Sequence, residues 1–260
     1  MLMPSILFEI NNGVGTITLN RPEKFNSFNR EMALLMQEKL DECAGNNEIR
    51  CVSITGMGKA FSAGQDLSEL TGDNPVGIDK ILSEHYNPII TRIRNLEKPV
   101  LALVNGVAAG AGANIALCCD IVVAAESASF LQAFSKIGLI PDSGGTYFLP
   151  RLIGWQKASA LMMLGEKVGS PEALALGMIY KMFPDESFWE ESNRMAQVLA
   201  QMPTKGLAFT KQALNHSLSN SLEEQLLKED ELQQKAAGTT DYKEGVAAFL
   251  EKRKPVFKGE

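Results

Sequence analysis

The chain has 260 residues, of which 45% are apolar and 22% are charged, and its formal net charge is −6. These proportions are those of a folded globular protein, and they exclude a chain that is mainly disordered. The sequence holds no run of about 18 apolar residues, so we expect no membrane span. The excess of acidic residues argues against nucleic acid as the main partner, because contacts to phosphates need clustered Lys and Arg.

The first part of the chain predicts strands that alternate with helices. The strands at 6–10 and 14–19 should form a hairpin, since Asn12 and Gly13 suit a turn with positive φ. Asn29 is a suitable cap for a helix that runs to about Cys43, and Pro88 should kink a helix that spans 78–96. A buried strand is expected at 51–55, and a glycine-rich loop at 56–64.

The second part of the chain adds further strands and ends in helices. Ser170 and Pro171 are typical of a helix start. The expected elements are strands at 100–104, 121–124 and 178–183, a buried helix within 106–119, an irregular segment at 130–140 and a helix opened by 141–145. From about Ser187 the strands stop, and two or three amphipathic helices remain. The pattern is that of an α/β protein with a core over 1–195 and a helical region over 196–260.

Several common chemistries find no support in the sequence. The chain has four cysteines, none in a CxxC spacing: Cys43, Cys51, Cys118 and Cys119. We therefore expect reduced thiols, no metal site and a cytoplasmic protein. The two histidines, His85 and His216, lie outside the glycine-rich turns, which argues against a Ser-His-Asp hydrolase.

Three glycine-rich segments, at 60–67, 105–114 and 138–146, combine strand ends with small residues. Small side chains let a ligand approach the main chain and leave N–H groups free. The first N–H groups of the helix near Ala111 have no partner within the helix, and the helix dipole adds positive charge there. Two such donors aimed at one point would stabilise a developing oxyanion. The alternative is that these glycines only form tight turns and close packing.

The order of these segments resembles that of the crotonase superfamily, the enoyl-CoA hydratases and isomerases. The matching stretches are 19–22, 61–67, 105–120, 138–145 and 244–253. The resemblance implies a spiral of ββα units with a C-terminal helical trimerisation region, assembled as a homotrimer or a dimer of trimers. It also implies an acyl-CoA thioester substrate and no separate cofactor. By motif position, the oxyanion donors fall on the backbone N–H groups of Ala63 and Ala111.

The reaction depends on which acidic residues reach the site. Hydratases of the superfamily use two glutamates, whose positions are taken here by Asn114 and Phe134, so we do not expect efficient hydration. One carboxylate remains in the region, Asp142, which we expect to act as a proton shuttle. Its alternative role is to cap a helix by accepting the N–H of Gly144 or Gly145. A single carboxylate suits isomerisation, which only moves a proton from one carbon to another.

Within the superfamily, the stretches at 86–88, 105–113 and 134–142 most resemble isomerases of phenylacetate degradation that act on ring-1,2-epoxyphenylacetyl-CoA. In that group, the aspartate at the position of Asp142 is the acid/base candidate. The alternatives are a Δ3-Δ2-enoyl-CoA isomerase, an enoyl-CoA hydratase of β-oxidation, and a module that only binds acyl-CoA or RNA.

The same motifs suggest residues that bind the substrate. They are Lys24, Ser62, Gly64, Gln65, Asp66, Leu67, Gly110 and Asn114. Lys24 is expected to reach a CoA phosphate, with a solvated loop lysine as the alternative. Asp66 either contacts the nucleotide or stabilises its own turn. Asn114 either lines the site or is a buried amide paired with the backbone.

Overall fold

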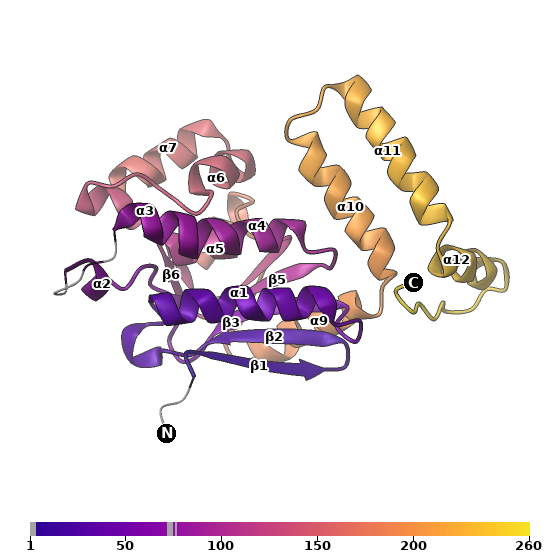
Figure 1. Ribbon diagram of the computed structural model, residues 1–260, viewed down its shortest axis with the longest axis horizontal. Helices are drawn as coiled ribbons and strands as arrows, with labels where there is room; N and C mark the ends of the chain where they lie inside the picture. Colours follow the sequence, from indigo (N-terminus) through magenta and orange to yellow (C-terminus); the bar gives the residue numbers. More distant parts are fainter. Residues whose placement is uncertain (1–3, 72–74, 76) are drawn as a thin grey trace.

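Two sheets form the centre of the molecule. The computed structural model describes residues 4–71, 75 and 77–260 (Figure 1). The first sheet has the order β1-β2-β3-β5-β7-β10, in which only the β1–β2 pair is antiparallel. Its strands are β1 (Ile6–Asn11), β2 (Val14–Leu19), β3 (Cys51–Gly56), β5 (Val100–Val104), β7 (Ile121–Ala125) and β10 (Lys181–Phe183). Asn12 and Gly13 both have positive φ, at 50° and 80°, which confirms the predicted hairpin turn.

The second sheet consists of four strands of three residues each, in the order β4-β6-β8-β9. These strands are β4 (Ala60–Ser62), β6 (Val107–Ala109), β8 (Ser129–Leu131) and β9 (Lys167–Gly169). Strands that follow one another in the chain alternate between the two sheets. In each of the pairs β3–β4, β5–β6 and β7–β8, the first strand belongs to the first sheet and the second strand to the second sheet, which confirms the expected ββα repeat. The sequence had predicted loop, helix and irregular structure over these short strands, because three residues carry too little alternation to identify a strand.

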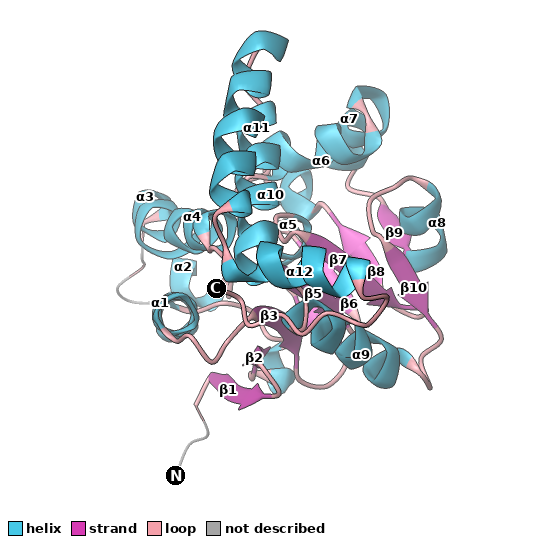
Figure 2. Cartoon of the chain, turned by 90° about the vertical axis from the view of Figure 1, so that its right-hand side faces the viewer, coloured by secondary structure: helices cyan, strands magenta, loops and turns pink. Residues whose placement is uncertain are grey.

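Helices cover both sides of the first sheet. In Figure 2, α1 (Arg30–Gly45) and α4 (Asn87–Asn95) lie on one side of the strands and α9 (Phe188–Ala200) lies on the other. The predicted cap of α1 is confirmed, since the Asn29 side chain accepts the N–H of Met32 at 3.0 Å. The side of α4 also carries the short helices α2 (Ser68–Thr71) and α3 (Ile78–Lys80).

The helix expected over 78–96 differs from the prediction at its centre. Between α3 and α4 lies a π-helix, η2 (Ile81–Tyr86), which ends as the N–H of Asn87 donates to the carbonyl of Leu82. The backbone stays helical from η2 into α4, since Tyr86 and Asn87 both have right-handed helical angles, so Pro88 lies inside a continuous helical segment. The interruption expected at Pro88 is present as the wider turn of η2 directly before it.

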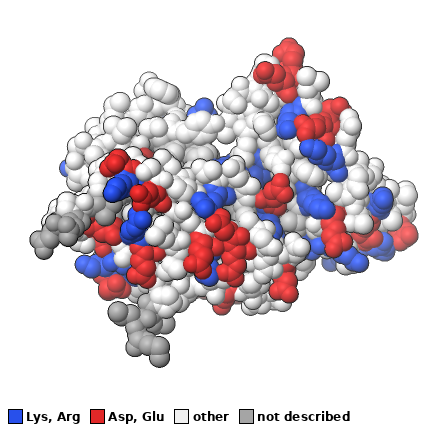
Figure 3. Space-filling model, viewed as in Figure 1, with Lys and Arg blue, Asp and Glu red and all other residues white. Residues whose placement is uncertain are grey.

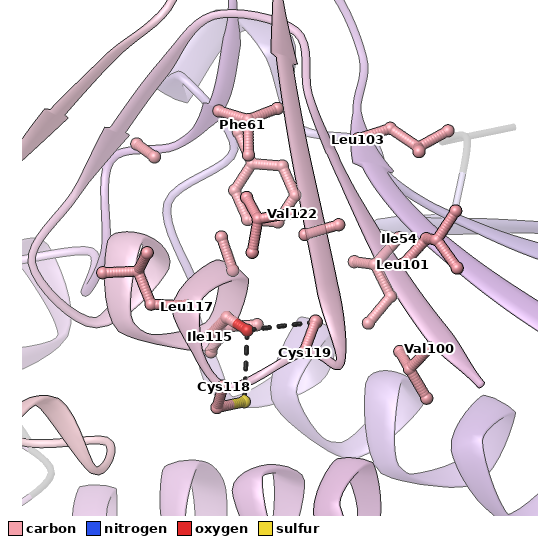
Figure 4. Close-up of a cluster of buried hydrophobic side chains, with 14 of the residues drawn as sticks. Ile54, Phe61, Val100, Leu101, Leu103, Ile115, Leu117, Cys118, Cys119 and Val122 are labelled. Atoms are coloured by element: carbon pink, nitrogen blue, oxygen red, sulfur yellow. Dashed lines mark hydrogen bonds between the residues drawn. The ribbon is translucent and has the colours of Figure 1, made fainter. Parts of the chain in front are cut away.

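Helix α5 (Ala111–Leu117) is buried along its whole length, as its apolar composition predicts. Its C-terminal end packs among side chains of β3, β5 and β7, including Ile54, Leu101 and Val122 (Figure 4). Cys118 and Cys119 follow the helix, and both thiols donate to the carbonyl of Ile115, at 3.1 and 3.3 Å. All four cysteines are free and buried.

The rest of the chain is largely helical. The further helices are the 3-10 helices η1 (Pro22–Lys24) and η3 (Ala133–Ile137), and the α-helices α6 (Gly145–Ile153), α7 (Trp155–Leu164), α8 (Ser170–Ala175), α10 (Thr204–Ser217), α11 (Leu222–Ala237) and α12 (Thr240–Leu250). Four helices, rather than two or three, follow Ser187. The expected boundary between 195 and 196 falls inside α9, which packs on the first sheet, so the separate helical region begins at α10.

Helices α10, α11 and α12 extend away from the sheets, on the right of Figure 1. A buried ion pair anchors α10 at its centre: Lys211 Nζ lies 2.8 Å from Asp120 Oδ2 and donates to the carbonyl of Ile93 at 2.7 Å. Arg94 lies 3.2 Å from the other oxygen of Asp120. Among the described residues, no helix combines the length and the apolar character that crossing a membrane requires.

Candidate active site

A cavity of about 480 Å³ brings the three glycine-rich segments together. Its walls come from the loop after β4 and α2, from α3 and η2, from the N-terminus of α5, and from η3 with the segment that joins it to α6. Most of the wall is aliphatic, and its larger apolar residues are Leu67, Leu70, Ile78, Ile81, Leu82, Phe134, Ile137, Leu139 and Ile140. Of the predicted substrate-binding residues, Gly64, Gln65, Leu67 and Gly110 line this cavity.

Ala63 lies in the cavity wall, but its amide is not free. The N–H of Ala63 donates to the carbonyl of Phe25 at 2.9 Å. A donor that is already paired cannot also serve a developing oxyanion without losing that hydrogen bond. The prediction that Ala63 supplies an oxyanion donor is therefore wrong. The motif predicted the right loop but the wrong amide within it.

Gln65, two residues further on, carries an amide without a partner. Its neighbours are both paired with Phe28, since the carbonyl of Gly64 accepts the N–H of Phe28 at 2.7 Å and the N–H of Asp66 donates to the carbonyl of Phe28 at 2.8 Å. This parallel bridge leaves the N–H of Gln65 facing away from Phe28. Within the described part of the chain, no acceptor is found for it.

The N–H of Ala111 is the second free donor on the cavity wall. Ala111 is the first residue of α5, so its N–H has no partner within the helix, and none is found elsewhere among the described residues. The two loops meet closely, because a Cβ added to Gly64 would lie 3.3 Å from the nitrogen of Ala111 and 2.9 Å from the carbonyl oxygen of Ala109. Gly64 also has a φ of +87°, so this position requires glycine.

Asp142 lines the same cavity and is the one carboxylate found among the described residues of its wall. Burial raises its pKa above the ordinary value of 3.8, against the opposing effect of a hydrogen bond from the hydroxyl of Ser143 at 2.8 Å. The alternative capping role does not hold, since α6 begins without a side-chain cap and Gly145 N–H donates to the main-chain carbonyl of Asp142. The carboxylate is therefore a candidate acid or base.

Asn114 does not line the cavity, contrary to the prediction that it binds substrate. Its side chain is only 1% exposed and is paired at both ends. The amide donates to the carbonyl of Asp142 at 2.8 Å, and the side-chain oxygen accepts from Gln132 Nε2 at 2.8 Å. The alternative of a buried amide paired with the backbone is the correct one.

Ser62 and Asp66 also differ from the prediction, because neither contributes to the cavity wall. Ser62 is fully buried, and its hydroxyl donates to the carbonyl of Asn26 at 2.8 Å. Asp66 accepts from Arg21 and from the hydroxyl of Ser68, at 2.9 and 2.7 Å. Burial alone would raise the pKa of Asp66, but these hydrogen bonds outweigh it and lower the pKa. Asp66 therefore stabilises its own turn.

Lys24 lies outside the cavity, exposed at the end of η1 and next to Phe25, whose carbonyl holds the loop of Ala63. A role in binding a CoA phosphate stays a prediction.

The site residue that sequence reasoning missed is Tyr86, which is buried, lines the cavity and donates to Gln65 Oε1 at 2.9 Å. Its stretch carried part of the family resemblance, but nothing in the sequence pairs it with Gln65.

The face of the molecule in Figure 3 carries a mixture of positive and negative side chains. Lys and Arg alternate with Asp and Glu over much of the face in Figure 3, without a continuous basic area on the described part of this view. The upper left of that face, over α6 and α7, is largely uncharged.

The described residues also contain no group of three His, Cys, Asp or Glu side chains that could hold a metal ion.

Comparisons with known proteins agree with this architecture. The sequence profile of the enoyl-CoA hydratase/isomerase family matches residues 9–260. The chain is 46% identical to 1,2-epoxyphenylacetyl-CoA isomerase of Escherichia coli K12, over 100% of both chains, and 43% identical to a "probable enoyl-CoA hydratase" of Rhodobacter capsulatus, over 98% of both. The crystal structure of an enoyl-CoA hydratase from Bacillus anthracis superposes with a TM-score of 0.92 at 31% identity, covering 98% of this chain and 100% of that one. The chain thus belongs to the enoyl-CoA hydratase/isomerase family.

Proposed function

We propose that the chain is an acyl-CoA isomerase in which the N–H groups of Gln65 and Ala111 hold the thioester oxygen and Asp142 moves the proton. The observation that carries this proposal is the meeting, on a single apolar cavity, of one half-buried carboxylate and two amides for which the described residues supply no acceptor. Donors fixed in this way act on developing charge without reorganising, which is usually the largest contribution to this kind of catalysis.

The chemistry follows from these three groups. The thioester carbonyl accepts hydrogen bonds from Gln65 and Ala111, which acidifies the neighbouring carbon. Asp142 removes a proton from that carbon, and the electron pair moves onto the thioester oxygen as an enolate. Asp142 then returns the proton to another carbon, so the product has the composition of the substrate. No electrons are gained or lost overall, so the proposed isomerisation requires no redox cofactor.

Hydration is the main rival reaction, and the relative from Rhodobacter capsulatus carries a hydratase name. Hydration needs one group to activate water and a group to deliver a proton. At the two positions where the resemblance places glutamates, this chain has Asn114, which is buried behind the loop of Asp142, and Phe134, which contributes an apolar ring to the wall. The single carboxylate on the described wall supports isomerisation over hydration.

For the acyl group we propose 1,2-epoxyphenylacetyl-CoA, with cis-3-enoyl-CoA as the second candidate. The proposal is supported by the 46% identity to the isomerase of that name over the whole chain. The cavity, at about 480 Å³, is large enough for a small ring, and its walls are mainly aliphatic. An enoyl chain would use the same two donors and the same carboxylate.

We further propose that the protein assembles as a homotrimer or a dimer of trimers in the cytoplasm. Large apolar side chains are exposed on α11 and α12, including Leu227 (73%), Phe249 (82%) and Leu250 (75%), which is unusual for a monomer. The four free thiols suit a reducing compartment. Light scattering after gel filtration would give the assembly mass, and a monomer at micromolar concentration would contradict this part of the proposal.

The function is tested by incubating the purified protein with epoxyphenylacetyl-CoA, cis-3-enoyl-CoA and crotonyl-CoA, with products identified by mass and ultraviolet spectrum. Isomers of unchanged mass are expected from the first two. The Asp142→Asn variant should lose about 10²–10⁴-fold in kcat while it still binds the substrate. Hydration of crotonyl-CoA at a rate comparable with isomerisation would contradict the proposal, as would unchanged turnover by Asp142→Asn.

A further inference from the structure

The side chain of Gln65 is held at both ends of its carboxamide. The hydroxyl of Tyr86 donates to Gln65 Oε1 at 2.9 Å. The amide group of Gln65 donates to Glu69 Oε2 at 3.0 Å and to the carbonyl of Asp66 at 3.3 Å. Both ends of the carboxamide are thus paired, whereas the described residues supply no acceptor for the backbone N–H of Gln65.

The position and the pKa of Tyr86 both favour its hydroxyl as a hydrogen-bond donor. It is the last residue of η2, its side chain is fully buried, and its ring packs edge to face on Phe28 with 5.8 Å between the ring centres. Burial raises its pKa well above 10, and the charges of Asp142 and Glu69 act in the same direction. The hydroxyl thus stays protonated at physiological pH and donates a hydrogen bond to Gln65 Oε1.

Without that donor, Gln65 Oε1 would be an unpaired acceptor on a residue that lines the same cavity as the N–H groups of Gln65 and Ala111, for which the described residues supply no acceptor. A glutamine side chain is long enough to fold back towards its own main chain, and the N–H of Ala111 lies close to the adjoining Gly64. A buried acceptor without a partner is costly, so the carboxamide would move to pair with one of these N–H groups. The paired amide would no longer be available to a thioester.

We propose that Tyr86 is a positioning residue that keeps the amide pair of Gln65 and Ala111 open, because its hydroxyl occupies the Gln65 side-chain acceptor that could otherwise pair with one of them. This inference rests on the proposed function, since it gives the two amides the role of oxyanion donors. Tyr86 acts through Gln65 and has no part in the proton transfer. Glu69 supports the other end, since its Oε1 accepts the N–H of Arg30 at the start of α1 while its Oε2 holds Gln65.

The test is the Tyr86→Phe variant, which keeps the ring and removes the hydroxyl. We expect kcat to fall about 10- to 100-fold, because an oxyanion donor that is displaced or already paired no longer stabilises the charge that develops in the transition state. KM should stay within about threefold, since that charge is absent from the bound substrate. Adding Gln65→Met, which removes the competing acceptor and keeps the backbone N–H, should raise kcat at least threefold above that of Tyr86→Phe alone. A purely structural role would instead make the double variant worse.

A spectroscopic measurement reads the amide pair directly. Phenylacetyl-CoA labelled with ¹³C at the thioester carbonyl serves as a probe that lacks the epoxide. Its carbonyl stretch should shift to lower frequency on the unmodified protein and return towards the free value on Tyr86→Phe. The control is Tyr147→Phe, which removes a hydroxyl outside the cavity and should behave as the unmodified protein.

The outcomes separate the inference from the function on which it rests. If the unmodified protein isomerises acyl-CoA and Asp142→Asn does not, the proposed function holds; Tyr86→Phe with unchanged kcat and carbonyl frequency would then overturn the role of Tyr86 alone. A double variant no better than Tyr86→Phe would overturn it as well. Should Tyr86→Phe not fold, the probe on Gln65→Met decides, since the shift should persist there and its loss would contradict the inference.

Discussion

The side-chain amide of Asn114 donates to the main-chain carbonyl of Asp142 at 2.8 Å, so Asn114 positions Asp142 by way of the Asp142 backbone. Gly145 makes this approach possible, because a Cβ at that position would lie 2.4 Å from Asn114 Nδ2. Gln132 completes the arrangement by donating to the other end of the Asn114 carboxamide. A position that holds a catalytic glutamate in hydratases, by resemblance, here supports the loop that carries the acid.

This relationship predicts the effect of Asn114→Ala. The substitution leaves the amide of Gln132 without its partner and the carbonyl of Asp142 with the N–H of Gly145 alone, which should lower the free energy of unfolding by about 1–3 kcal/mol. It should also lower kcat, because the loop of Asp142 loses its anchor. The control is Asn215→Ala, which breaks a similar bond to the carbonyl of Arg94 far from the cavity and should cost stability alone. Wild-type kcat in Asn114→Ala would contradict this role.

The raised pKa of Asp142 predicts the pH dependence of activity. The carboxylate must be ionised to remove a proton, so kcat/KM should fall with decreasing pH through a pKa above 3.8. Ser143→Ala removes the hydrogen bond that lowers this pKa, so the acidic limb of the profile should move to higher pH. Ser68→Ala, which acts in the same way on Asp66, should leave the limb in place. An acidic limb of the kcat/KM profile that lies at the same pH in Ser143→Ala as in the unmodified protein would be inconsistent with Asp142 as the titrating base.

The same shift predicts that Asp142 lowers stability at neutral pH. An acid whose pKa is higher in the folded protein than in the unfolded chain costs nothing below the unfolded pKa and its full cost above the folded pKa. Asp142→Asn should therefore unfold at a higher temperature than the unmodified protein at about pH 7, and the difference should vanish at about pH 3. Thermal unfolding across this range measures the effect; equal midpoints at neutral pH would speak against a raised pKa for Asp142.

Two glycines with similar backbone angles should respond differently to alanine. Gly64 and Gly138 have φ of +87° and +74°, but only at Gly64 does an added Cβ meet other atoms, including the Ala109 oxygen at 2.9 Å. Gly138→Ala should cost about 1–2 kcal/mol of stability from its backbone angle alone. Gly64→Ala should cost more and should abolish turnover, because the contact between the two donor loops must open. Comparable losses in both variants would rule out the close approach at Gly64 as the cause.

The difference between Ala63 and Gln65 marks the limit of what sequence reasoning could predict at this site. The glycine-rich loop and the N-terminus of α5 were predicted from residue types, because helix starts and small residues leave amides free wherever they occur. Which amide of the loop stays free depends on Phe25 and Phe28, which pair with Ala63, Gly64 and Asp66 from a distant part of the chain. Such long-range pairing has no local signal.

The fold shows the same division. The hairpin turn at Asn12 and Gly13, the cap at Asn29 and the buried α5 all follow from local rules, and all were predicted. The second sheet was missed, because strands as short as Ala60–Ser62 exist only through their neighbours in space. The π-helix was missed as well, since an α-helix has the same apolar spacing over so few residues.

The π-helix marks a place where the length of the chain can change. An α-helical hydrogen bond reaches back four residues, whereas the N–H of Asn87 reaches back five, to the carbonyl of Leu82, so η2 holds one residue more than an α-helical turn. Deleting one residue between Leu82 and Tyr86 should therefore relax the segment to an ordinary α-helix, with the residues before and after it facing as they do now. Tyr86 should then keep its hydrogen bond to Gln65. In a regular α-helix the same deletion would turn every following side chain by about 100°.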